Sequence, residues 1–394
     1  MAIRSFPHTL YIEVISVIYV VQPGDTLSSI ARQFDVSVAS VRNRNQIPVG
    51  APLVVGQALL ILNSIKTTPL SIQVNGYAYP FISPFVLRES LTRLNLLSVF
   101  SYGFLPDGTL LPPFLGDDRL LQAARQAGVE ASLVLTPFGP DGQFNNVLVN
   151  SLLANPAAQE RLLSQLQTVM TQKGYAELNI DFEFVLEEDR VAFADFVALA
   201  ADTLEYRVSV CLAPKTSAEQ RGILVSGKDY RLLGQAVDRV LLMTYEWGYK
   251  YGEPFAVAPL DKVRQVVEYA VTEIPTEKIS LGLANYGYDW PLPFQRGQTV
   301  ARTIGNVEAV ELARRVGAEI QFDEPSQSPW FSYQNRGVDH VVWFEDVRSW
   351  QAKCDLVAEF GLTGVGIWQL QSLFRAGLDL LGENFRYPLG LSVG

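Results

Sequence analysis

The chain has 394 residues, of which 48% are hydrophobic and 18% charged, so it is long enough for one barrel-sized domain and a small module. Asp and Glu outnumber Lys and Arg by 41 to 31, and the resulting net charge of −10 argues against nucleic acid as a partner while leaving glycans open. The two cysteines, Cys211 and Cys354, are too few for a disulfide framework, and neither His8 nor His340 has a zinc-ligand spacing, so we expect no metal site.

The N-terminal segment from Thr9 to Val21 is strongly apolar, but Glu13 interrupts it. It is too short to span a bilayer and carries no clear small-residue cleavage site. We therefore expect residues 1–17 to form an N-terminal extension that is neither a signal peptide nor a membrane anchor, and we expect no membrane partner.

A small strand–helix–helix–strand unit is predicted for residues 18–63. Its expected elements are a strand at 17–21, a turn at 23–25, a first helix capped by Thr26, a second helix at 36–45 and a closing strand at 58–62.

The run from Tyr19 to Ala31, together with Asn45 and residues 56–59, resembles a LysM domain. Such modules bind chains that contain N-acetylglucosamine, either peptidoglycan or chitin, in a groove between the loop before the first helix and the loop after the second. The resemblance implies a glycan-binding groove lined by Gly24, Asp25, Thr26, Leu27, Asn45, Gln46 and Ile47. The tripeptide 24–26 alone would be better explained as a turn followed by a helix cap, but the 45-residue pattern favours the LysM interpretation.

Beyond a polar connector at 63–70, strand-like apolar runs alternate with amphipathic helical stretches. The expected strands are 70–77, 95–101, 130–136, 177–183, 206–212, 238–244, 278–284 and 363–369. The expected helices are 83–91, 117–127, 157–173, 188–204, 218–235, 258–272 and 306–316. Eight near-continuous apolar strands are typical of a closed parallel sheet buried on both faces, so we predict a (β/α)8 TIM barrel over residues 70–390.

The interval between the seventh and eighth predicted strands is much longer than an ordinary βα unit. Residues 286–345 within it are rich in Trp, Tyr and Pro. We expect them to form an inserted α+β subdomain over the carboxyl-terminal face of the barrel.

Two carboxylates mark the end of the fourth strand, where a barrel carries its functional side chains. Alternation along the strand places Asn179, Asp181 and Glu183 on one face, about 6–7 Å apart in succession, and apolar residues on the other. An edge strand with a polar solvent face would show the same alternation; within an apolar barrel, the polar set points inward. Two confined carboxylates cannot easily both be charged, so we expect the pKa of Glu183 to rise until it serves as a general acid.

This run resembles the signature of glycoside hydrolase family 18, Asp-Gly-x-Asp-x-Asp-x-Glu, which also ends barrel strand four. Asp181 and Glu183 match it, whereas Ala176, Glu177 and Asn179 depart from it and leave the level of activity open.

Other strand ends carry the same resemblance. Tyr245 and Glu246 follow the sixth strand in a Met-x-Tyr pattern, and Trp368 ends the eighth strand. The resemblance implies that Asn179, Glu246 and Trp368 contact substrate, and Tyr102, just after the second strand, is a further candidate.

Family 18 implies a substrate-assisted retaining mechanism that needs no metal and no cofactor. Glu183 would protonate the glycosidic oxygen, and the substrate's own 2-acetamido oxygen would attack the anomeric carbon. Asp181 would accept the acetamido N–H, Tyr245 would orient the acetamido group, and Trp368 would floor the −1 subsite.

Within the family, the resemblance is strongest to the LysM-bearing enzymes of endospore formers that degrade spore cortex during germination. It rests on residues 75–79, 245–249, 254–260 and 342–346. It implies a β-N-acetylglucosaminidase acting on peptidoglycan, located in the spore cortex or coat or at the cell wall. The alternatives are an inactive glycan-binding coat protein, which the departure at Ala176 and Glu177 favours, and a chitinase-type enzyme; the presence of Glu183 favours an enzyme.

Overall fold

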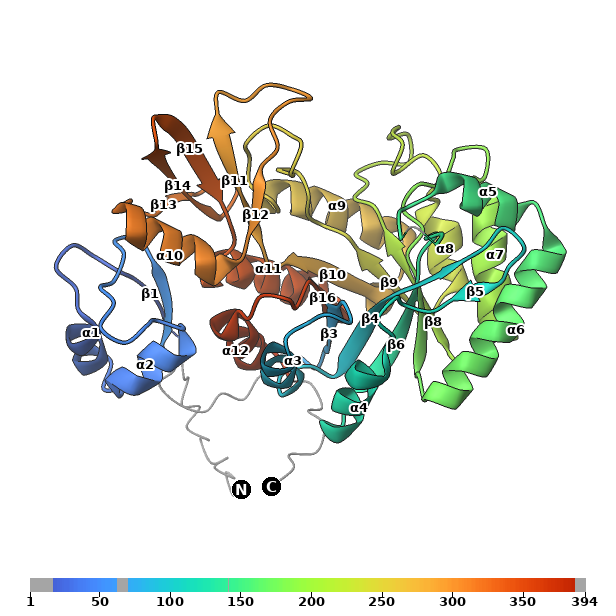
Figure 1. Ribbon diagram of the computed structural model, residues 1–394, viewed down its shortest axis with the longest axis horizontal. Helices are drawn as coiled ribbons and strands as arrows, with labels where there is room; N and C mark the ends of the chain where they lie inside the picture. The colour runs from blue at the N-terminus through green and yellow to red at the C-terminus, as the bar shows by residue number, and fades with distance from the viewer. Residues whose placement is uncertain (1–16, 62–69, 141, 387–394) are drawn as a thin grey trace, which may run out of the picture.

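The computed structural model describes residues 17–61, 70–140 and 142–386. Apart from Val17, the expected N-terminal extension lies outside the described residues, as does nearly all of the connector at 63–70. Figure 1 shows a small N-terminal module beside a barrel, with a separate sheet that rises next to both.

The N-terminal module has the predicted strand–helix–helix–strand order. Its elements are β1 (Val17–Val20), α1 (Leu27–Gln33), α2 (Val38–Arg44) and β2 (Ala58–Ile61), and β1 pairs with β2 in antiparallel fashion. Thr26 caps α1, because its hydroxyl accepts the Ser29 N–H while the Ser29 hydroxyl accepts the Thr26 N–H. The apolar faces of both helices close over β2 to form a small core of their own.

Eight parallel strands form the predicted closed barrel. They are β3 (Gln73–Ala78), β4 (Leu96–Phe104), β6 (Glu130–Leu135), β7 (Glu177–Ile180), β8 (Arg207–Leu212), β9 (Arg239–Leu242), β10 (Ile279–Ala284) and β16 (Gly364–Trp368). β3 pairs with both β16 and β4, which closes the ring, and the short β5 (Leu110–Leu111) adds to β4 in antiparallel fashion. The TIM-barrel prediction is therefore confirmed.

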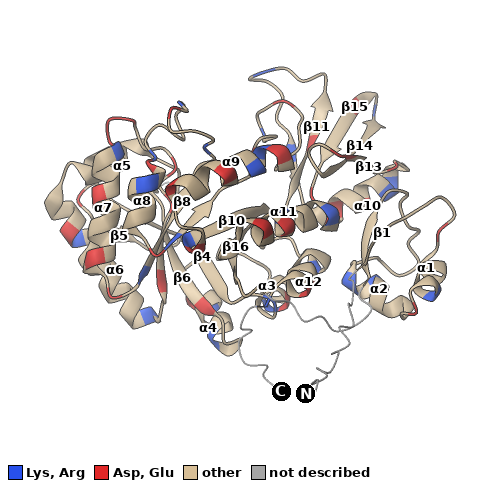
Figure 2. Ribbon diagram, turned by 180° about the vertical axis from the view of Figure 1, so that it is seen from behind, with Lys and Arg blue, Asp and Glu red and all other residues tan. Residues whose placement is uncertain are grey.

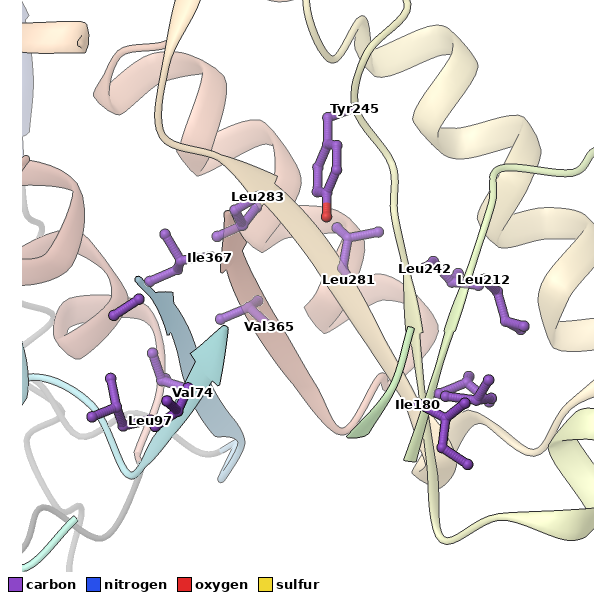
Figure 3. Packing of buried hydrophobic residues seen from close by; sticks show 14 of the residues in the cluster. Val74, Leu97, Ile180, Leu212, Leu242, Tyr245, Leu281, Leu283, Val365 and Ile367 are labelled. Atoms are coloured by element: carbon purple, nitrogen blue, oxygen red, sulfur yellow. The ribbon is translucent and has the colours of Figure 1, made fainter. Parts of the chain in front are cut away.

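Helices surround the barrel and cover the outward apolar side chains of its strands, of which Figure 3 shows Val74, Leu97, Ile180 and Val365. They are α3 (Pro84–Leu91), α4 (Asp118–Gln126), α5 (Asn146–Leu153), α6 (Pro156–Lys173), α7 (Arg190–Thr203), α8 (Tyr230–Ala236), α9 (Leu260–Glu273), the 3-10 turn η1 (Thr276–Lys278), α11 (Val347–Phe360) and α12 (Arg375–Asn384). The sequence prediction missed α5, α11 and α12.

The helix expected at 218–235 is wrong over most of its length, because α8 begins only at Tyr230. Gly222 has a φ of 155°, outside the helical range, and Gly227 packs against the backbone of Val185. Residues 213–229 therefore form a loop that lies against the segment following β7.

The expected α+β insertion between the seventh and eighth barrel strands is confirmed. Its elements are β11 (Gly287–Leu292), β12 (Arg302–Ile304), α10 (Asn306–Val316), β13 (Gln321–Asp323), β14 (Ser328–Asn335) and β15 (Val338–Trp343). The strands form an antiparallel sheet in the order β12-β11-β15-β14-β13.

The N-terminal module is docked on this insertion. Val54 of the module belongs to the same apolar cluster as Ile320, and the Ile320 N–H donates to the Val55 carbonyl oxygen at 2.9 Å. Gly56 lies so close that a Cβ atom there would be 1.8 Å from the Ile320 carbonyl oxygen. The Arg348 guanidinium also donates to the Gly56 carbonyl oxygen at 3.2 Å.

A second set of contacts joins the module to α12, as the neighbouring ribbons in Figure 1 indicate. Arg44 forms an ion pair with Asp379 at 3.0 Å, and Arg375 donates to the Asn43 carbonyl oxygen at 2.7 Å. The module is therefore packed onto the barrel domain along two of its edges.

Acidic and basic positions are interspersed along the outer helices in Figure 2. Within the described ranges, no helix is both long and apolar enough to cross a membrane.

Candidate active site

A cavity of about 300 Å³ opens at the carboxyl ends of the barrel strands. Its lining residues are Tyr77, Asp181, Glu183, Cys211, Ala213, Pro214, Leu224, Leu241, Met243, Tyr245, Glu246, Tyr288 and Trp368. Of the sequence-predicted residues, the structure thus brings together Asp181, Glu183, Tyr245, Glu246 and Trp368.

β7 positions the two carboxylates through strict alternation. Ile180 and Phe182 are fully buried in the helix-facing core, so Asp181 and Glu183, just beyond the strand end, point the other way into the cavity. The Asp181 N–H donates to the Leu135 carbonyl oxygen at 2.9 Å, which fixes the chain at this point.

The surroundings separate the titrations of the two acids. Burial raises the pKa of Asp181 to about 6, although the Lys228 ammonium and a hydrogen bond from Cys211 oppose the shift. Burial and the negative charge of Asp181 raise the pKa of Glu183 to about 8, again against Lys228. Between these values Asp181 is a carboxylate beside a protonated Glu183, which is the arrangement that a general acid requires.

Tyr245 reaches the cavity from just past β9. Figure 3 shows its ring beyond the strand end with the hydroxyl directed back toward the barrel. Gly282 of β10 leaves room for this segment, because a Cβ atom there would lie 2.5 Å from the Leu242 carbonyl oxygen and 2.9 Å from Cε1 of the tyrosine ring.

Trp368 stands among aromatic rings at one side of the cavity. Its ring centroid lies 4.8 Å from that of Phe100, 5.8 Å from that of Tyr77 and 5.9 Å from that of Tyr79. Edge contacts of this kind hold the indole in one orientation, so a broad apolar face is available to a sugar ring.

Glu246 is held by the segment that begins the insertion. Its carboxylate accepts the hydroxyl of Tyr286 and, at 2.8 Å, the hydroxyl of Tyr288. Its φ of 69° turns the chain sharply at the cavity mouth. The insertion thus contributes directly to the site.

Asn179 lies one layer deeper than expected and does not line the cavity. Its side-chain oxygen accepts the Tyr77 hydroxyl at 3.1 Å and the Cys211 thiol at 3.3 Å, and its amide donates to Ser209 at 2.9 Å. The expectation that it contacts substrate is corrected: Asn179 supports Tyr77 from below.

Tyr102 is also misplaced by the sequence prediction. The pairing of β4 with β6 shifts register between Val99 and Tyr102, which turns the tyrosine to the helix-facing side. There its hydroxyl donates to Asp117 at 2.6 Å and its ring contacts Tyr175 edge-on, so it lies outside the cavity.

The sequence prediction missed several lining residues. Alternation along β3 would have placed Tyr77 inside the barrel, so a signal for it existed. No sequence signal marked Leu224 as a lining residue, because the pattern of its segment predicts a helix. Cys211 is buried and free, and it lines the cavity as well.

Comparison with known proteins agrees with this geometry. The model of glycosyl hydrolases family 18 matches residues 141–372, and the LysM domain model matches residues 19–62. The chain belongs to glycosyl hydrolase family 18.

Two relatives illustrate how far the similarity extends. The "Cortical fragment-lytic enzyme" of Bacillus subtilis (strain 168) is 36% identical, with 93% of this chain and 98% of the relative covered. The spore cortex-lytic enzyme SleL of Bacillus cereus superposes with a TM-score of 0.90 at 29% identity, covering 95% of this chain and all of that one. A chitinase of Chromobacterium violaceum, at 23% identity and a TM-score of 0.73, shares the fold.

The departure of this family 18 chain from the signature has a structural explanation. Glu177 lies at the barrel floor, where its carboxylate pairs with Arg239 at 3.2 Å and accepts the Ser209 hydroxyl at 2.7 Å. Asn179 fills the layer between this ion pair and Asp181. Glu177 and Asn179 therefore pack and bond within the barrel interior beneath the catalytic layer.

In the second loop of the LysM module, Asn45 and Gln46 are half-buried and line a small surface pocket, whereas Ile47 is buried. Asn45 bonds to the Val41 and Leu60 backbones, and Ile47 is buried in the module core. Gln46 donates to the Leu373 carbonyl oxygen at 3.1 Å and accepts the Arg375 N–H at 2.7 Å. These contacts hold the loop against the module core and the barrel domain, and a glycan-binding role for the three residues stays a prediction.

The first loop of the module is accessible. Gly24 and Thr26 are exposed and Leu27 is half-buried. Asp25 accepts the Tyr19 hydroxyl and the Gln22 N–H, both at 2.7 Å, which orders the loop. A glycan-binding role for these four remains a prediction.

No cluster of His, Cys, Asp and Glu suited to a metal ion occurs within the described parts of the chain.

Proposed function

We propose that this family 18 enzyme is a β-N-acetylglucosaminidase that hydrolyses peptidoglycan, with spore-cortex fragments as its substrate. The observation that carries the proposal is that Asp181, Glu183 and Tyr245 line one cavity, in which burial and the charge of Asp181 raise the pKa of Glu183 above that of Asp181. Such a pair fits acid-catalysed departure of a sugar combined with electrostatic support of a neighbouring group.

The reaction proceeds in two steps. Glu183 gives its proton to the glycosidic oxygen while the substrate's 2-acetamido oxygen attacks the anomeric carbon, which forms an oxazolinium ion and releases the leaving sugar. Asp181 accepts the acetamido N–H and balances the positive charge, and the Tyr245 hydroxyl orients the acetamido group. Water, deprotonated by the Glu183 carboxylate, then opens the oxazolinium ring with net retention and restores the acid.

An exposed aromatic groove supports a polymeric substrate. It has a volume of about 420 Å³ and includes Trp247, which follows the cavity residue Glu246 directly in sequence, together with Tyr249, Tyr251 and Phe255. Aromatic faces of this kind stack on the apolar faces of sugar rings, so a glycan strand that extends beyond the cleaved bond gains further contacts.

The relatives and the LysM module support the choice of glycan and location. Cortex-lytic activity is what the names of the similar Bacillus proteins state, and LysM modules accompany binding to peptidoglycan or chitin-type chains. We assign the protein to the spore cortex or coat, or to the cell wall, bound through its glycan substrate and with no nucleic-acid partner.

The test is hydrolysis of purified cortex fragments and of N-acetylglucosamine oligomers. The wild type should cleave the cortex fragments, and Glu183→Gln should lose activity by a factor of about 10²–10⁴ because the general acid is gone. Glu188→Gln, the same change at an exposed position five residues further on, is the matched control and should retain full activity. Absence of turnover by the wild type on both substrates would refute the proposal, and oligomer cleavage alone would favour a chitinase-type enzyme.

A further inference from the structure

A fully buried lysine lies behind the catalytic strand end. The Lys228 ammonium donates to the carbonyl oxygen of Phe182, the residue between Asp181 and Glu183. It also lies 4.5 Å from the centroid of the Phe193 ring. Nothing in the family signature corresponds to this residue.

The position of Lys228 is imposed by its neighbours. A Cβ atom at Gly227 would lie 2.2 Å from the Val185 carbonyl oxygen, so only glycine lets the loop approach the segment after β7 this closely. On the other side, the Asp229 carboxylate accepts the Leu232 N–H and thereby starts α8. The chain therefore delivers the lysine to the Phe182 carbonyl with little freedom.

The charge of this lysine has no direct carboxylate partner. Among the residues that the structure describes, the Lys228 ammonium donates to a carbonyl oxygen and is hydrogen-bonded to no Asp or Glu side chain. A buried, unbalanced ammonium is strongly unfavourable, so the nearest negative charges must compensate it. Those that interact with it are Asp181 and Glu183, and the Cys211 thiol is the other titratable group that does so.

We propose that Lys228 is a positioning residue of the catalytic centre, whose ammonium fixes the peptide between Asp181 and Glu183 and supplies the counter-charge for the ionised Asp181. The proposal rests on the function proposed above for the two carboxylates. Lys228 lies in a loop far from Asp181 and Glu183 in sequence. Through its charge, it would set the pH range in which Asp181 is ionised and Glu183 is protonated.

The direction of the effect follows from Coulomb's law. A nearby cation favours the ionised form of an acid, so Lys228 lowers the pKa of both Asp181 and Glu183 against the larger effect of burial. Activity requires Asp181 ionised and Glu183 protonated. Without the cation both pKa values rise, and both limbs of the pH–rate profile move to higher pH. The other charge that faces Glu183, that of Glu246, remains in place.

The experiment measures kcat/KM against pH, with N-acetylglucosamine oligomers, for the wild type, Lys228→Met and Lys228→Gln. Both variants remove the charge, and Gln keeps a donor for the Phe182 carbonyl. Both should move both limbs upward by about one pH unit. A purely structural role would lower the rate and leave the limbs in place.

Lys215 provides the matched control. It is also buried, and its ammonium donates to the Lys228 carbonyl oxygen at 3.1 Å, yet the charges that act most strongly on its pKa are those of Asp229 and Arg190. Lys215→Met should therefore disturb the same loop without shifting the limbs. If the limbs of the pH–rate profile stay at their wild-type positions in either Lys228 variant, the proposal is overturned. An inactive wild type would instead refute the proposed function.

A second measurement needs neither activity nor a change at Lys228. Because the interaction is reciprocal, Asp181→Asn should lower the pKa of Lys228, which burial has already reduced to about 8. Nuclear magnetic resonance of ¹³C-labelled lysines should show one buried lysine titrating at lower pH in Asp181→Asn but not in Glu188→Gln. An unchanged lysine titration would contradict the proposal even if the Lys228 variants fail to fold.

Discussion

Asp181 and Glu183 occupy the same strand end, and their different surroundings give them different proton affinities. Strand alternation predicted from sequence that both point inward, because the intervening Phe182 is apolar. It did not predict that Lys228 lies behind them, because the burial of that lysine depends on the contact of Gly227 with a distant segment. Single-residue roles that depend on alternation were thus accessible from sequence, and those that depend on tertiary contacts were not.

The first prediction at this scale concerns the pH–rate profile of the wild type. The acidic limb should report ionisation of Asp181 near pH 6 and the basic limb deprotonation of Glu183 near pH 8. The profile of kcat/KM on soluble oligomers should therefore be bell-shaped with its maximum between these values. A profile that stays flat from pH 5 to pH 9 would contradict the separation of the two titrations.

The second prediction concerns stability. The pKa of Glu183 is about 8 in the folded chain against an ordinary value of 4.5, so the folded state binds this proton more tightly. The resulting stabilisation is fully present below about pH 4.5 and is lost as the pH rises through 8. Glu183→Gln should consequently raise Tm by more at pH 8.5 than at pH 5, as thermal unfolding can show. An equal change at both pH values would count against the raised pKa.

Secondary-structure elements decide which of the predicted residues reach the cavity. The eight strands were predictable because each is a continuous apolar run, and the parallel order followed from the alternating helices. The register shift in β4 was not predictable, since nothing local to Tyr102 marks it, and it moved that residue out of the site. Residues 218–229 were mistaken for part of a helix, although they belong to a loop that supplies Leu224 and Lys228.

A prediction at the element scale concerns the close contact between β10 and Tyr245. Gly282→Ala should lower kcat by about tenfold or more, because the added methyl group would press on the Leu242 carbonyl oxygen at 2.5 Å and on the Tyr245 ring at 2.9 Å, and so displace the segment that carries Tyr245. Ser280→Ala, two residues earlier on the same face of β10, is the control and should leave kcat near the wild-type value. If the effect passes through Tyr245, it should not add to that of Tyr245→Phe in a double-mutant cycle. Full additivity would show that Gly282 acts elsewhere.

At the scale of the whole molecule, the LysM module is packed against the insertion and the barrel. The module shares an apolar cluster with the insertion through Val54, and its second loop bonds to the barrel through Gln46. The LysM pattern was recognisable in sequence because it is local, whereas its docking depends on partners at the other end of the chain. The module is therefore part of the catalytic domain's packing as well as a candidate glycan-binding unit.

Two glycines of the module test this docking. Gly56 and Gly50 both have positive φ, 83° and 78°, but only Gly56 presses on Ile320, while a Cβ atom at Gly50 meets nothing within 4 Å. Gly56→Ala should therefore lower Tm clearly more than Gly50→Ala, in which the backbone strain alone acts. Equal losses in differential scanning calorimetry would indicate that the contact contributes nothing to stability.

The configuration of the first product tests the central claim most directly. If the acetamido group of the substrate is the nucleophile and Asp181 its partner, proton NMR during early hydrolysis of an N-acetylglucosamine oligomer should show the β-anomer before mutarotation. The same oligomer should remain uncleaved by Glu183→Gln. Initial appearance of the α-anomer would contradict the account, because inversion requires a carboxylate that activates water directly.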